Sequence, residues 1–311
     1  MQNSFRRLLL TGAACAALQT AAAQTTVLRN DDLSSMSGWF NSSTSGISLL
    51  NGGLSVSAGR HALTYFAPSA TPQALASGET LQVTFDLSFT TVGTTSGGFR
   101  VGLFDSNGAT RPTANGVSTT FQGYNGYAFT FTPNPGADSN SLNLRKRLTD
   151  GTNQLLNSIT DGTNYSIFNS GNSSSSGSAS GQVFQTGTVY AATYSISRGS
   201  GNALTIDFSV TGGAAGWNFG KSYSIVGPND LAFDAFAILS VSNIAPSSGS
   251  NFAIDNLRIA HIAASSGFSA FDLGGPTVIP EPSTYAACAG AAVLGLAFWR
   301  RRRAAAKALA A

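Results

Sequence analysis

Alternation of apolar and polar residues is the feature that most limits how this chain can fold. In residues 81–90 every second side chain is apolar, which places five apolar residues on one face of an extended strand and five polar residues on the other. Residues 190–196 and 204–210 repeat the pattern, and no segment between residues 24 and 280 shows a convincing helical period. This pattern is typical of half-buried antiparallel strands.

Other segments extend the strand prediction. Residues 231–241 are nearly all apolar, which indicates a central strand covered on both faces. Residues 252–259 begin in one alternation phase and end in the other, so we predict a β-bulge near Asp255 and Asn256. Many short strands separated by turn signals predict an all-β fold, an antiparallel β-sandwich of jelly-roll type over residues 24–262. Further strands are predicted at 99–103 and 127–131.

Two segments of the central region have the composition of flexible chain. Residues 169–181 are almost wholly Ser, Gly and Asn, which predicts a mobile loop. Residues 263–277 follow the last predicted strand, and we expect them to be a linker.

The first 23 residues have the three-part order of a secretory signal peptide. A pair of arginines is followed by an apolar run over 8–18 and by three alanines at 21–23. Signal peptidase accepts only small side chains beside the bond that it cuts. We therefore predict export through the Sec machinery and cleavage between Ala23 and Gln24.

The other end of the chain contains an uncharged apolar segment over 283–299. As a helix its 17 residues would measure about 25 Å, near the lower limit for crossing a bilayer. A basic cluster follows directly, and it predicts a stop-transfer signal that keeps residues 304–311 in the cytoplasm. The cluster consists of Arg300, Arg301, Arg302 and Arg303.

Pro280, Glu281 and Pro282 stand immediately before this segment. With the apolar segment and the basic cluster, the triplet resembles the PEP-CTERM sorting domain of Gram-negative bacteria over residues 278–303. The resemblance implies recognition and cleavage by exosortase, an integral-membrane cysteine protease. It also implies a transient anchor in the inner membrane, followed by delivery to the cell surface or the exopolysaccharide matrix.

The central region is poor in chemically reactive groups. Between residues 24 and 280 it carries ten Lys or Arg and thirteen Asp or Glu, a net charge of −3, with no basic stripe for nucleic acid. Cys15 and Cys288 both lie outside it, which excludes disulfides and thiolate chemistry there. His61 and His261 have neither zinc-ligand spacing nor a Gly-x-Ser-x-Gly elbow, so we expect structural roles and no cofactor.

The shortage of glutamates argues against glycoside hydrolysis. The chain has only two glutamates, Glu79 and the sorting residue Glu281, so the Glu-x-Asp-x-x-Glu arrangement of jelly-roll glucanases cannot be built. Asp86 and Asp207 remain as an alternative pair, but strand alternation explains both as solvated polar-face residues.

The predicted sandwich resembles concanavalin-like lectins and related jelly-roll domains. Aromatic faces combined with planar polar groups bind sugars, and Tyr124, Asn125, Tyr127 and Trp217 supply both. The alternative is that these aromatic rings fill the core.

Three functions are compatible with these features. The first is a non-catalytic, surface-sorted matrix or adhesion protein associated with exopolysaccharide. The second is a lectin-like carbohydrate-binding module. The third, an unusual polysaccharide-active enzyme, is disfavoured by the shortage of glutamates and the absence of a nucleophile motif.

Overall fold

The computed structural model is entirely β in the part of the chain that it describes. Every regular element there is a strand, which confirms the all-β prediction, and none of these segments forms a helix able to cross a bilayer. All of them belong to one compact unit spanning Ala21–Ser266. The predicted membrane segment 283–299 lies outside them. The described residues are 23–41, 46–50, 52–57, 59–90, 99–116, 121–131, 142–148, 155–156, 165–167, 173–176, 184–213, 218–227, 229–240 and 250–265.

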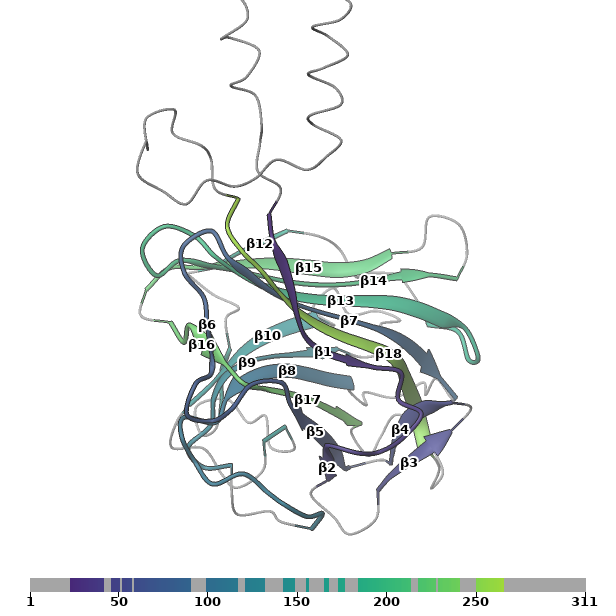
Figure 1. Cartoon of the computed structure of the whole chain (residues 1–311). Coiled ribbons are helices and arrows are strands. Elements are labelled where there is room, and N and C mark those ends of the chain that lie inside the picture. Colours follow the sequence, from purple (N-terminus) through teal and green to yellow (C-terminus); the bar gives the residue numbers. More distant parts are fainter. Residues whose placement is uncertain are drawn as a thin grey trace, which may run out of the picture. The chain divides into compact units, whose positions relative to one another are not determined.

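Two antiparallel sheets face each other (Figure 1). The large sheet has nine strands in the order β12-β15-β14-β13-β7-β18-β4-β3, with β1 paired to β18, and the small sheet has seven in the order β11-β10-β9-β8-β17-β5-β2. The strands of the large sheet are β1 (Thr25–Asp31), β3 (Ile47–Leu50), β4 (Gly53–Ser57), β7 (Thr80–Phe89), β12 (Ser173–Ser176), β13 (Val189–Arg198), β14 (Leu204–Gly212), β15 (Asn218–Ile225) and β18 (Ser250–Ile262). The strands of the small sheet are β2 (Trp39–Asn41), β5 (His61–Tyr65), β8 (Phe99–Asp105), β9 (Asn125–Phe131), β10 (Leu142–Arg147), β11 (Tyr165–Ile167) and β17 (Ala235–Ser240), and β6 (Gln73–Ala74) pairs separately with β16 (Ala232–Phe233).

The main core lies between the sheets and is rich in aromatic rings. In β7, buried and half-buried residues alternate along the whole strand, as the sequence predicted. Phe129 of β9 packs against Phe208 of β14 with ring centroids 5.5 Å apart, and Phe99 of β8 packs against Phe252 of β18 at 4.8 Å. Such contacts join the sheets because each buried ring removes a large apolar area from water.

A second core covers the outer face of the small sheet. Strand β17 is buried along its whole length, since Phe236 belongs to the main core and Ala237 to the second one. The predicted central strand covered on both faces is therefore confirmed for residues 235–240, whereas residues 232–233 of the predicted strand form β16, which pairs with β6. The other members of the second core are Leu63, Phe104, Phe121, Tyr124, Ala128, Leu155, Leu156, Tyr165, Ala235 and Leu239.

Arg147 holds the segments of this second core together. Its side chain is only 1% exposed, and it donates hydrogen bonds to the carbonyl oxygens of Phe121 at 2.8 Å, Tyr124 at 3.0 Å and Leu155 at 3.2 Å. A buried guanidinium thus ties two chain segments to β10 through their backbones.

The structure confirms one local prediction and corrects another. The register between β18 and β7 shifts between Asp255 and Arg258, and Asn256 has a left-handed φ of 51°, as expected for the predicted bulge. The Ser-rich segment 169–181, in contrast, is not all loop, because β12 (Ser173–Ser176) pairs with β15 and forms the edge of the large sheet. An edge strand offers backbone hydrogen bonds to any extended segment, whatever its side chains.

Candidate functional site

A pocket of about 310 Å³ lies on the outer face of the large sheet, over β7, β18 and the β3–β4 hairpin. Small residues form its floor: Ser88 stands opposite Ala253 in the β7–β18 pair, and Gly53 of β4 lies beside Asp255. Leu50 and Val189 rise at its sides, and Val189 is 60% exposed. The hollow therefore follows from small side chains on the central strands flanked by larger ones.

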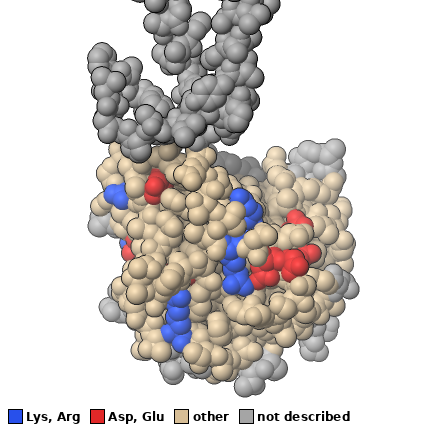
Figure 2. Space-filling model, viewed as in Figure 1, with Lys and Arg blue, Asp and Glu red and all other residues tan. Residues whose placement is uncertain are grey.

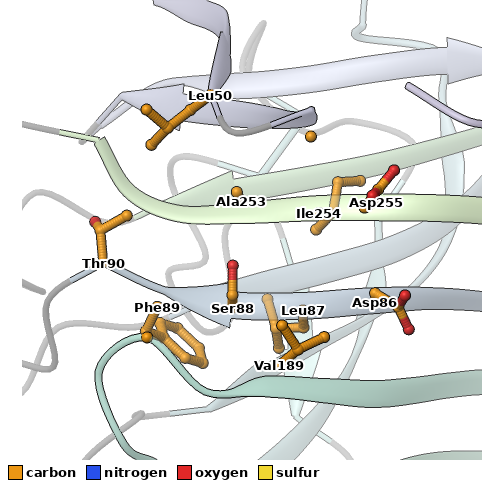
Figure 3. Close-up of a pocket in the computed structure, with 12 residues that line it drawn as sticks. Leu50, Asp86, Leu87, Ser88, Phe89, Thr90, Val189, Ala253, Ile254 and Asp255 are labelled. Atoms are coloured by element: carbon orange, nitrogen blue, oxygen red, sulfur yellow. The ribbon is translucent and has the colours of Figure 1, made fainter. Parts of the chain in front are cut away.

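Two carboxylates stand at one end of this pocket, while Leu50 and Thr90 lie at the other (Figure 3). Asp86 of β7 is directly opposite Asp255 of β18 in the strand register. Residues paired in this way have Cα atoms about 4.5–5.5 Å apart. Two negative charges are thereby brought to one edge of a largely apolar hollow.

Asn256 orients both carboxylates. Its backbone N–H donates to Oδ1 of Asp255 and its side-chain Nδ2 donates to Oδ2 of Asp86, each at 2.8 Å. The left-handed backbone of the bulge places one residue within reach of both acids. Within the described part of the chain, the remaining oxygen of each carboxylate accepts no hydrogen bond, and neither acid forms a salt bridge.

The pocket presents hydrogen-bond acceptors and apolar surface. No Lys or Arg is found among its described lining residues, and the adjoining segments 91–98 and 241–249 contain neither residue type. Arg258 lies further along β18, opposite Thr84. No group of three or more His, Cys, Asp or Glu suited to a metal ion occurs among the described residues.

The structure does not bring the predicted aspartate pair together. Asp86 is opposite Ala191 of β13, whereas Asp207 of β14 is opposite Ser195 of the same strand. Strand β13 therefore lies between the two acids, and their positions along it differ by four residues. Sequence reasoning missed Asp255 as the neighbour of Asp86, although its position at the predicted bulge marked it as a special residue.

The predicted glycan-binding residues do not form one exposed surface. Tyr124 belongs to the second core, where its hydroxyl lies 2.6 Å from that of Tyr65 and burial raises its pKa to about 12. Tyr127 is buried in the main core, on the opposite face of the small sheet, and its hydroxyl accepts a hydrogen bond from the Asp230 N–H. Asn125 is partly exposed, and Trp217 lies outside the described residues. The two tyrosine rings thus have no free face for a sugar, in line with the core-filling alternative.

The two histidines lie far from the pocket. His61 is buried against Phe121, and burial, with the nearby charges of Arg147 and Arg60, lowers its pKa to about 4. His261 is the penultimate residue of β18 and lies 3.0 Å from the carboxylate of Glu79. The pKa of Glu79 is lowered chiefly by a hydrogen bond from the Ala76 N–H.

Comparison with protein families identifies the tail. A model described as the PEP-CTERM protein-sorting motif matches residues 278–303, so the chain carries the motif predicted from Pro280, Glu281 and Pro282. The motif implies export and membrane-anchored processing by exosortase. No curated protein matches the sequence.

Several solved structures share the outline of the fold at low identity. The CBM2 module of the evolved Dit of Lactobacillus casei BL23 phage J-1 is 10% identical, with a TM-score of 0.42, over 78% of this chain and 97% of that one. The lectin from Bauhinia forficata, solved with GalNAc, is 15% identical, with a TM-score of 0.39, over 78% and 100%. The exoplasmic domain of VIP36, in its Ca²⁺- and mannose-bound form, is 9% identical, with a TM-score of 0.39, over 79% and 87%. The similarity is too distant to transfer a ligand or a site.

Proposed function

We propose that this protein is a non-catalytic component of the cell surface or extracellular matrix that associates with exopolysaccharide. Signal peptidase would remove residues 1–23 after Sec export, and exosortase would release the sandwich from the inner membrane. The observation that carries the proposal is the sorting motif at residues 278–303.

The arrangement of the two ends of the sandwich supports this route. Strand β1 begins at Thr25, directly after the proposed cleavage site, and pairs with the end of β18. The first and last strands of the sandwich are therefore neighbours in the large sheet. A domain connected in this way can complete its sheets while either flank is still held in a membrane.

Surface composition supports a structural role. Lys, Arg, Asp and Glu form only a few small groups on the face shown in Figure 2, where the largest acidic group adjoins a basic one, and the chain is 10% charged. A weakly charged surface does not steer nucleic acid or other strongly charged polymers by long-range attraction. Neutral polyols and sugars are bound instead through short-range hydrogen bonds and apolar contacts.

The sorting step is tested by changing the signature prolines. In cells that contain exosortase, intact-mass analysis of the wild-type protein should show a new C-terminus near the motif and an N-terminus at Gln24. A chain with Pro280→Ala and Pro282→Ala should keep its tail and remain in the membrane fraction, because the extended recognition stretch is lost. Thr277→Ala, outside the signature, is the matched control. Equal processing of the double variant would contradict the proposal.

A second candidate function, carbohydrate binding, is favoured by the pocket over β7 and β18. Its acceptor groups and apolar sides are of the kind that hold a saccharide. Neither candidate includes bond cleavage. Release of reducing ends from a polysaccharide, abolished by Asp86→Asn, would contradict both and favour an enzyme.

A further inference from the structure

We propose that the pocket between Leu50, Val189 and the Asp86–Asp255 pair binds a saccharide unit that carries a protonated amino group. The inference deepens the carbohydrate-binding candidate and rests on the proposed delivery to an exopolysaccharide environment. The binding itself depends only on the folded sandwich.

The charge of the ligand follows from the two carboxylates. Asp86 and Asp255 face each other across one strand pair, and each has one oxygen bonded by Asn256. Two like charges at this separation repel one another, and a cation placed between the free oxygens removes that repulsion. An ammonium group has three donors and no acceptor, which matches a pocket end made of acceptors.

The body of the ligand follows from the rest of the pocket. The hydroxyl of Ser88 lies on the floor between the acids and the far end, where it can exchange hydrogen bonds with a ring hydroxyl (Figure 3). Leu50 and Val189 offer apolar surface to the C–H groups of a sugar ring. The volume of about 310 Å³ is at the lower end of the range for small-molecule sites. A monosaccharide unit within a longer chain fits this size and chemistry better than a peptide or a bare ion.

Calorimetric titration of the full chain in mild detergent tests the proposal. The probes are a glucosamine tetrasaccharide, its fully N-acetylated form and a glucose tetrasaccharide with the same linkage. All titrations are done at a pH below the pKa of the glucosamine amine. We expect the glucosamine form to bind at least about tenfold more tightly than the two neutral forms, as a charge-assisted hydrogen bond should provide. Equal affinity for all three, or no binding of the glucosamine form, would overturn the proposal.

Variants locate the binding site. Asp255→Asn and Asp86→Asn should each weaken binding of the glucosamine form by about tenfold, because each removes half of the negative charge. Asp207→Asn, on the same sheet but outside the pocket, is the matched control and should leave the affinity unchanged. Val189→Ala removes an exposed side of the pocket without disturbing the core and should weaken binding severalfold. It keeps the test valid if an aspartate variant misfolds.

Calcium provides the final arm of the test. Calcium chloride alone should neither bind at the pocket nor displace the glucosamine tetrasaccharide. Displacement by calcium that is lost in Asp255→Asn would identify the pair as a metal site and overturn the proposal. Because the assay needs no export or processing, its failure is distinguishable from failure of the sorting proposal.

Discussion

Thr25, the first residue of β1, pairs with Ile262, the last residue of β18. One step further out, the N–H of Ala263 donates to the carbonyl oxygen of Gln24 at 2.8 Å. The ladder between the two ends thus continues up to the residue that the predicted signal cleavage would leave as the N-terminus. Only Gln24 separates the predicted cleavage site from the first residue of β1. A cut further into the chain would therefore remove part of the sheet.

Docking of β1 should depend on Leu28, which packs against the main core. Leu28→Asp should destabilise the protein by about 2–3 kcal/mol, since a carboxylate would replace a half-buried apolar side chain. For a domain of this size the melting temperature should fall by about 5 °C or more. Val27→Asp on the same strand is the control, because Val27 is 48% exposed. Equal melting temperatures for the two variants, measured by circular dichroism, would show that β1 contributes little to stability.

The second core should depend on Arg147. Arg147→Met keeps most of the side-chain volume but removes the donors to the carbonyls of Phe121, Tyr124 and Leu155. We expect a loss of about 2–4 kcal/mol in the free energy of unfolding, because buried carbonyl groups would lose charge-assisted partners. Arg60→Met changes an exposed arginine and should cost less than about 0.5 kcal/mol. Urea unfolding curves for both variants give the comparison, and a small effect of Arg147→Met would mean that water replaces the lost donors.

Stability should fall in mild acid because of His61. Burial, together with Arg147 and Arg60, lowers its pKa to about 4 from an ordinary value of 6.5. The unfolded chain therefore binds a proton before the folded one does, and stability decreases as the pH falls from 6.5 towards 4. The contribution is up to about 3 kcal/mol.

His61→Met should flatten this acid-dependent slope. Unfolding free energies measured across the same pH range make the test. Glu79 acts in a lower window: its lowered pKa gives stability that is lost only below its ordinary value of 4.5. A slope unchanged by His61→Met would mean that His61 is protonated in the folded protein as well.

Local features of the fold were predictable because local patterns determine them. The alternation of β7, the double burial of β17 and the bulge at Asp255 and Asn256 can all be identified in short stretches of sequence. The burial of Tyr124 is different, because Tyr124 stands one residue before β9 (Asn125–Phe131) and strand alternation does not govern it.

Long-range pairing was not predictable from the same patterns. Asp86 meets Asp255 only because β7 pairs with β18, and the hydrogen bond that links Asp86 to Asn256 spans 170 residues of sequence. Many strands share the same alternation, so no local signal selects one partner over another. The pocket, which depends on that register, was therefore invisible in the sequence, as was the pairing of the Ser-rich β12 with β15.

Gly53 links the stability of the large sheet to the shape of the pocket. A Cβ atom at this position would lie 2.6 Å from the carbonyl oxygen of Ile254, a backbone atom that cannot rotate away. Gly53→Ala should therefore push β4 away from β18 and destabilise the protein by about 1–3 kcal/mol. The matched control is Gly123→Ala, where the nearest atom would be 3.8 Å away and the backbone is not left-handed. Thermal unfolding should show a lower melting temperature for Gly53→Ala and an unchanged one for Gly123→Ala. If Gly53→Ala melts like the wild type, the close approach of β4 to β18 at the pocket does not exist in solution, and the pocket would have a different floor.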